Sequence, residues 1–112
     1  MIQLGKGVPV TADLLELTVE RQGSRTRLAV HGDLHLRTRD QLIRAVVAAL
    51  EQASTIELDL TGVGFCDSMG ISALIASRNL AALDDKRIVI GPISPEVEAI
   101  LRVSGLLDSL TD

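Results

Sequence analysis

The sequence has no tryptophan or tyrosine, one phenylalanine and one cysteine among its 112 residues. Because bases stack on aromatic side chains, this shortage argues against binding of single-stranded nucleic acid. A single cysteine excludes an intramolecular disulfide and a zinc site built from several cysteines. We therefore expect Cys66 to be a reduced, partly buried thiol in a turn, and a redox sensor is the less favoured alternative.

Positive charge is also scarce, because 11 lysines and arginines face 15 acidic residues and leave a net charge of −4. No basic run is present, which disfavours binding to duplex DNA or to an anionic membrane. No apolar run approaches membrane-spanning length, and the first ten residues lack the apolar core of a signal peptide. We expect a soluble cytoplasmic protein that neither contacts nucleic acid directly nor inserts into a membrane.

Aliphatic residues are abundant. Hydrophobic residues make up 46% of the chain, which excludes a disordered tail, and the length suits one domain with one core. Residues 1–12 include Gly5, Gly7 and Pro9, so we expect an irregular N-terminal arm followed by a domain over residues 13–112.

Strand and helix patterns follow one another along this domain. Alternating apolar residues predict strands at 15–20, 26–31, 55–60 and 86–90, the first two forming an antiparallel hairpin. Helical spacing predicts helices that run to about Gln52, from 68 to about 83, and from 95 to about 104. The order β-β-α-β-α-β-α predicts an α/β fold with a mixed sheet of four to five strands and helices chiefly on one face. The expected core is aliphatic: Leu28, Val30, Val46, Leu50, Ile56, Leu58, Leu60, Leu74, Ile88, Ile90 and Ile100.

Several element ends are also predicted by local signals. Thr38 and Gln41 have the spacing of a capping box, which starts the first helix after Thr38. Gly62 and Gly64 predict a tight turn after the third strand. Gly91 and the proline that follows it predict a turn after the fourth strand.

The candidate site lies in TGVGFCDSMGISALI, residues 61–75. The change from strand to helical spacing makes Asp67 the expected N-cap of the second helix and Ser68 its first residue. A phosphoryl group on Ser68 would meet free amides and the positive end of the helix dipole. On local pattern alone, a serine that simply starts a helix is the favoured interpretation, ahead of a phosphorylation site.

The same stretch resembles the signature of the STAS domain, specifically of bacterial anti-sigma factor antagonists, which is roughly D-[LF]-S-x-[VL]-x-F-[ML]-D-S-[ST]-G-[LI]-G-x-L. Met69 replaces the family's second Ser or Thr, and Ser72 replaces a Gly. Ser94 to Leu106 fits the family's closing segment, so the resemblance covers nearly everything after residue 13. The positions that match the signature are Asp59, Leu60, Val63, Phe65, Asp67, Ser68, Gly70, Ile71 and Leu74.

This resemblance implies the STAS fold and a binding module controlled by phosphorylation. The unmodified protein would bind an anti-sigma factor that is also a serine kinase, and would thereby free a sigma factor. Phosphorylation of Ser68 would end the association, and a serine phosphatase would restore it. Asp67 and Gly70 would support the site, and the expected partner-binding residues are Asp33, His35, Phe65, Met69 and Ile71.

His35 stands where the family often has an acid beside the phosphorylated serine, which bears on the choice of partner. Met69 and His35 keep an alternative open: a STAS subunit of a stress-signalling scaffold or of a lipid-transport ATPase complex, without a phosphoserine switch. The retained Asp67-Ser68 pair favours the switch.

Other chemistry finds little support in the sequence. Ser68 lies in C-D-S-M-G rather than G-x-S-x-G, and no P-loop is present, so we expect no catalytic residue and no cofactor. His31 and His35 are four residues apart but lack a plausible third ligand, so we expect no metal site.

Overall fold

A computed structural model describes residues 14–107 of the chain. The predicted N-terminal arm, residues 1–12, lies outside the described residues, and so does the predicted start of the domain at residue 13. The elements follow the predicted order β-β-α-β-α-β-α. They are β1 (Glu16–Gln22), β2 (Arg25–Leu34), α1 (Leu36–Leu50), β3 (Thr55–Cys66), α2 (Ser68–Leu83), β4 (Arg87–Ile93) and α3 (Pro95–Ser104).

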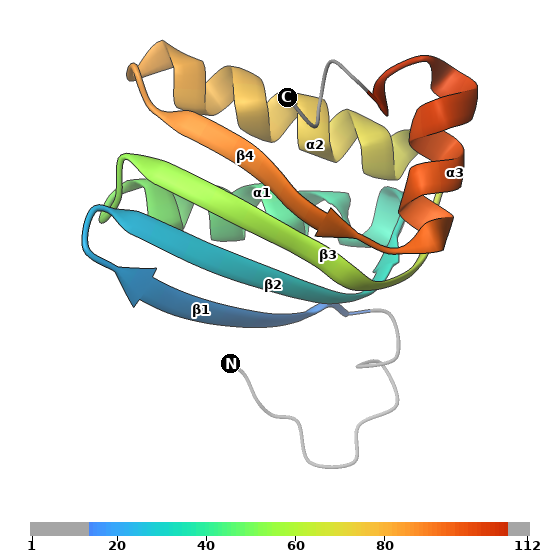
Figure 1. The fold of residues 1–112 in the computed structure, drawn as a ribbon, viewed down its shortest axis with the longest axis horizontal. Coiled ribbons are helices and arrows are strands. Elements are labelled where there is room, and N and C mark those ends of the chain that lie inside the picture. Colours follow the sequence, from blue (N-terminus) through green and yellow to red (C-terminus); the bar gives the residue numbers. More distant parts are fainter. Residues whose placement is uncertain (1–13, 108–112) are drawn as a thin grey trace.

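Within the described residues, four strands form one mixed sheet in the order β1-β2-β3-β4 (Figure 1). β1 and β2 form the predicted antiparallel hairpin, which turns at Gly23 with a φ of +68°. β2 and β3 are parallel, as are β3 and β4, so each pair needs a crossover connection. The helices α1 and α2 supply these crossovers and pack against each other on one face of the sheet, while α3 packs against β3 (Figure 1). The predicted α/β architecture is therefore confirmed.

The core lies between the sheet and the two crossover helices, and it is aliphatic as predicted. Leu28, Leu58 and Leu74 are completely buried, and the other predicted core residues are at least nine-tenths buried, with one exception. Ile100 is only partly buried, because Val97 and Leu101 are the residues of α3 that face inward.

The predicted turn at Gly62 and Gly64 is wrong, because β3 continues to Cys66. Gly62 pairs with His31 of β2 beside a shift in register, and a Cβ at Gly62 would overlap the His31 imidazole. Here glycine permits a close approach between neighbouring strands instead of a turn. The longer strand carries Phe65 and Cys66 to the end of the sheet.

The predicted turn at Gly91 is wrong for a similar reason. β4 continues through Gly91 to Ile93, and a Cβ at Gly91 would lie 2.7 Å from a carboxylate oxygen of Glu57 on β3. The proline that follows is tolerated because β4 is an edge strand of the described sheet.

Candidate functional site

The candidate site forms where β2 and β3 end and α1 and α2 begin. The register pairs Asp33 with Phe65 and Leu34 with Cys66. Two segments that are about 30 residues apart in the sequence therefore meet at one end of the sheet, as expected for parallel neighbours.

Asp67 is the N-cap of α2, the position that its sequence context predicts. Its backbone is extended, and its Oδ1 accepts hydrogen bonds from the amides of Met69 at 2.9 Å and Gly70 at 3.1 Å. Ser68 is the first residue of the helix and is exposed. The Asp67 carboxylate thus occupies amides that sequence reasoning had left free for a phosphoryl group on Ser68.

Gly70 packs the start of α2 directly onto the end of β2. A Cβ at Gly70 would lie 2.5 Å from the Leu34 carbonyl oxygen and 2.8 Å from Cys66 Sγ, distances that real Cβ atoms do not adopt. Asp67 also donates its amide to the Leu34 carbonyl at 3.2 Å. The exposed Ser68 is therefore attached to a segment that is closely packed on its inner side.

The start of α1 differs from the predicted one, because the N-cap is His35 and not Thr38. His35 Nδ1 accepts from the Arg37 amide at 3.1 Å, and the His35 amide donates to Thr38 Oγ1 at 3.2 Å. Thr38 Oγ1 donates in turn to the Asp33 carbonyl at 2.6 Å. Sequence reasoning missed this cap because histidine is not among the preferred N-cap residues.

Gln41, the predicted partner in the capping box, has a different role. It bonds both backbone groups of Leu15: the Leu15 amide donates to Oε1 at 2.8 Å, and Nε2 donates to the Leu15 carbonyl at 3.0 Å. Gln41 therefore fixes the chain just before β1 and takes no part in starting α1.

Four of the five predicted partner-binding residues are accessible at this end of the molecule. Phe65 is 48% exposed and Met69 36% exposed, and Asp33 is also exposed. The His35 and Phe65 rings lie 6.3 Å apart and are tilted by 54°. A shallow hollow links this pair to Asp67 and also involves two residues that sequence reasoning missed, Leu36 and Arg37. Their only signal in the sequence was their place beside His35.

Ile71, the fifth predicted partner-binding residue, does not belong to this surface. Its side chain is only 5% exposed and forms part of the hydrophobic core. The first turn of α2 carries Ser68 and Met69 to the outside and Ile71 to the inside. The assignment of Ile71 to a partner surface is therefore wrong.

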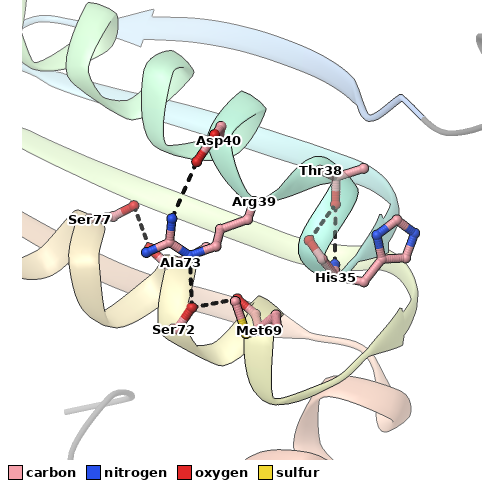
Figure 2. Close-up of polar contacts among 8 residues, drawn as sticks. All are labelled: His35, Thr38, Arg39, Asp40, Met69, Ser72, Ala73 and Ser77. Carbon is pink, nitrogen blue, oxygen red and sulfur yellow. Dashed lines mark hydrogen bonds and ion pairs between the residues drawn. The ribbon is translucent and has the colours of Figure 1, made fainter.

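Arg39 connects the first turns of the two helices (Figure 2). Its Nε donates to Ser72 Oγ at 2.9 Å, and its Nη1 lies 3.2 Å from Asp40 Oδ1. Ser72 Oγ donates in turn to the Met69 carbonyl at 2.7 Å. No acidic residue stands in the first turn of α1 to complement the helix dipole. Arg37 and Arg39 lie there instead.

Cys66 is a free thiol, 8% exposed, at the end of β3, and not in the predicted turn. Burial raises the pKa of the thiol from 9.0 to about 11, and the nearby Asp67 carboxylate adds to this increase. The thiolate is the reactive form, so the high pKa disfavours the redox-sensor alternative.

Metal and membrane sites receive no support from the part of the chain that the structure describes. Between residues 14 and 107, no three His, Cys, Asp or Glu side chains are grouped so that they could hold a metal ion. None of the helices in the same range is long and apolar enough to cross a membrane. His31 is exposed.

Solved structures with this architecture include an anti-sigma factor antagonist from Mycobacterium paratuberculosis, at 20% identity and a TM-score of 0.75, with 88% of this chain and 84% of that chain covered. The anti-sigma factor antagonist SpoIIAA in its unphosphorylated form gives 18% identity and a TM-score of 0.69, covering 87% of this chain and 86% of that one. The phosphorylated form of SpoIIAA from Bacillus gives 17% identity and a TM-score of 0.65, covering 87% of this chain and 89% of that one. At these identities the likeness shows a common fold.

Among curated proteins, none matches the sequence significantly. A family model, described as "Mlab, STAS domain", matches residues 17–112. This match includes every described strand and helix except the first residue of β1. The chain therefore belongs to the STAS domain family.

Proposed function

We propose that this protein is an anti-sigma factor antagonist controlled by phosphorylation of Ser68. In the unmodified state it binds an anti-sigma factor that is also a serine kinase, and this binding frees a sigma factor. The observation that carries the proposal is the position of Ser68: exposed at the first position of α2, beside the exposed side chains of Phe65 and Met69. Solved structures of a similar antagonist in unphosphorylated and phosphorylated forms support it.

The exposed apolar groups explain how the unmodified protein would bind. Burial of apolar surface contributes roughly 25 cal/mol per Å², and aromatic side chains at the centre of an interface contribute most. Phe65, Met69 and Leu36 offer such surface, with Leu36 67% exposed. Asp33 and His35 add polar contacts at the edge of this surface.

The kinase partner supplies the chemistry of the switch, and the antagonist supplies only the acceptor. Ser68 Oγ loses its proton and forms a bond to the γ-phosphorus of ATP, the bond to the β–γ bridging oxygen breaks, and ADP leaves. The product carries about −1.5 to −2 additional charge at a surface that must lose its water on docking. The partner therefore dissociates without any refolding of the antagonist, until a serine phosphatase hydrolyses the ester.

The test is incubation with ATP and a candidate kinase, namely a small ATP-binding protein encoded beside this one, followed by intact-mass measurement. We expect one added phosphoryl group on the wild type and none on Ser68→Ala. Phosphorylation of both proteins, or of neither by any neighbouring kinase, would contradict Ser68 as the acceptor.

A second candidate function is a STAS subunit of a larger assembly, without a phosphoserine switch. The matching family model carries the description "Mlab, STAS domain". In addition, a second apolar surface lies at the ends of α1 and α2 that are far from Ser68. There Val47, Leu80 and Leu83 are 41%, 37% and 80% exposed around a hollow beside Lys86. Leu83 lies about 22 Å along the helix axis from Ser68, so binding there would not respond to phosphorylation.

One comparison separates the two candidates. Phe65→Ser should weaken binding to the kinase partner at least about tenfold, since it removes an aromatic side chain from the proposed interface. Leu83→Ser should leave that affinity unchanged. The reverse result would favour the assembly subunit.

A further inference from the structure

We propose that Arg39 is the intramolecular partner of the phosphoryl group on Ser68. This inference rests on the proposed function, because it takes Ser68 as the phosphorylated residue. It concerns what holds the modified side chain, which neither the family resemblance nor the position of Ser68 decides.

The first step is that α2 has few amides left for a phosphate. Helix N-termini bind anions through unpaired amides and the helix dipole. Here the Met69 and Gly70 amides already donate to Asp67 Oδ1, and the Ile71 amide donates to the Asp67 carbonyl at 3.0 Å. Of the first four amides of α2, these three are already paired, so a phosphoryl group on Ser68 would draw further donors from outside its own helix turn.

The second step is that Arg39 already reaches this side of α2. Ser68 and Ser72 are four residues apart in the helix, so they lie on the same side with about 5–6 Å between their Cβ atoms. Arg39 Nε is hydrogen-bonded to Ser72 Oγ, as Figure 2 shows, so Arg39 contacts the residue that lies about one helical turn along α2 from Ser68.

The third step is that the present bonds of Arg39 are the weaker ones. Ser72 is a neutral acceptor, and Asp40 is an adjacent residue whose side chain is 70% exposed. Ion pairs at exposed positions contribute little, whereas hydrogen bonds between a guanidinium and a phosphate are charge-assisted, often bidentate and roughly twice as strong as neutral ones. The Arg39 side chain is 31% exposed, so its end group is accessible to a phosphate.

Phosphorylation would therefore move the Arg39 guanidinium from Ser72 to the phosphoryl oxygens, while Ser72 keeps its bond to the Met69 carbonyl. The phosphate would then tie α1 to α2 across the site. Ser72 is the residue that replaces the family's Gly in the signature. In this chain the Ser72 hydroxyl accepts the hydrogen bond from Arg39 in the unphosphorylated state.

The experiment places phosphoserine at residue 68 during synthesis and follows its second ionisation by ³¹P NMR. Free phosphoserine has a second pKa of about 6, and a nearby cation lowers the pKa of an acid. We expect a wild-type value about 0.5–1 unit lower, and recovery of that difference in Arg39→Gln. Arg39→Lys keeps the charge but loses the paired N–H donors of the guanidinium, so it should give an intermediate pKa.

Arg44→Gln is the matched control, since it makes the same change of charge on the same helix, about 140° further round. It should shift the pKa by less than about 0.2 unit, because exposed charges on another side of the helix are well screened. The other charged residues near the starts of the two helices, Asp40, Asp67 and Arg37, are unchanged in these three variants.

Three outcomes would overturn the proposal: no change of the phosphoserine pKa in Arg39→Gln, an equal change in Arg44→Gln, or recovery in Arg37→Gln instead. If Arg39→Gln does not fold, Ser72→Ala is used instead, and the NMR resonance of Arg39 Nε–H is compared with and without phosphoserine at residue 68. The proposal requires that this resonance shifts on phosphorylation. Because the phosphoserine is built in, this result is independent of any kinase, whereas the proposed function fails or holds on the kinase experiment alone.

Discussion

The inner and outer sides of residues 65–71 differ sharply in how they are held. On the inner side, Cys66, Gly70 and Ile71 are buried against β2 and the core. On the outer side, Phe65, Ser68 and Met69 are exposed. The inner residues decide where the segment lies, and the outer residues decide what it presents. A modification on the outer side can therefore change binding without disturbing the fold.

The two sides arise from two periodicities that meet at Asp67. In the strand, Phe65 and Cys66 point to opposite faces because successive side chains alternate. In the helix, a rotation of about 100° per residue separates Ser68 and Met69 from Gly70 and Ile71. Asp67 joins the two patterns, since its side chain caps the helix and its amide bonds to Leu34.

The largest expected difference between the two sides concerns thiol reactivity. Burial raises the pKa of Cys66 from 9.0 to about 11, so at pH 8 the thiolate fraction is about 100-fold lower than in an ordinary thiol. Alkylation of the folded protein by iodoacetamide should be at least about 100-fold slower than alkylation of the denatured chain, because burial also restricts access.

The pH dependence of this reaction has a defined sign. The rate in the folded protein should keep rising about tenfold per pH unit up to about pH 11. The rate in the denatured chain should instead level off near pH 9. The same raised pKa stabilises the fold below about pH 9, and this contribution is lost as the pH rises towards 11. A folded-state rate within tenfold of the denatured rate would mean that Cys66 belongs to the outer side.

The next largest effect should come from filling the contact between α2 and β2. Gly70→Ala places a methyl group 2.5 Å from the Leu34 carbonyl, a backbone atom that cannot move freely. The free energy of unfolding should fall by about 1–3 kcal/mol, the usual cost of overpacking. Urea denaturation measures this change.

Gly64→Ala is the control for this substitution. At Gly64 the nearest atom to a new Cβ would be Asp33 Oδ1 at 3.9 Å, an ordinary contact. We expect a change within about 0.5 kcal/mol, as for a substitution that touches nothing important. Equal losses at the two glycines would remove the distinction between the inner and outer sides.

A smaller effect is expected at the boundary between the sides. Asp67→Ala removes the acceptor for the Met69 and Gly70 amides and should lower the free energy of unfolding by about 0.5–2 kcal/mol. It should also slow phosphorylation of Ser68, because the first turn of α2 becomes less ordered. Asp67→Asn keeps the cap and should retain most of the stability. An unchanged denaturation midpoint for Asp67→Ala would show that the cap does not support the site.

The sequence was sufficient for the parts of this site that follow local rules. The cap at Asp67, the position of Ser68 and the start of α3 at Pro95 depend on a few neighbouring residues. Contacts between distant segments could not be predicted in the same way. Gly62 faces His31 across the sheet, and Arg39 reaches Ser72 from another helix, so neither contact has a signature in the local sequence.

Two errors at the site have physical causes that a single pattern could not reveal. His35 caps α1 because its Nδ1 meets the Arg37 amide, although histidine is a rare cap. Ile71 was expected at the surface because it belongs to the segment at this end of the sheet, but its side chain on α2 packs inward. A resemblance therefore identifies the segment more reliably than it identifies the exposed side.

The smallest effect on folding, and the most informative one, should come from Ser68 itself. Ser68→Ala should change the free energy of unfolding by less than about 0.5 kcal/mol, because the exposed hydroxyl lies outside the cap. By calorimetry, the kinase partner should bind Ser68→Ala as tightly as the wild type. Ser68→Asp should bind more weakly, but less so than phosphoserine, because it adds one charge and two oxygens where the phosphate adds about −1.5 to −2 and three. Equal affinity for wild type, Ser68→Asp and the phosphorylated protein would contradict the switch and favour the assembly subunit.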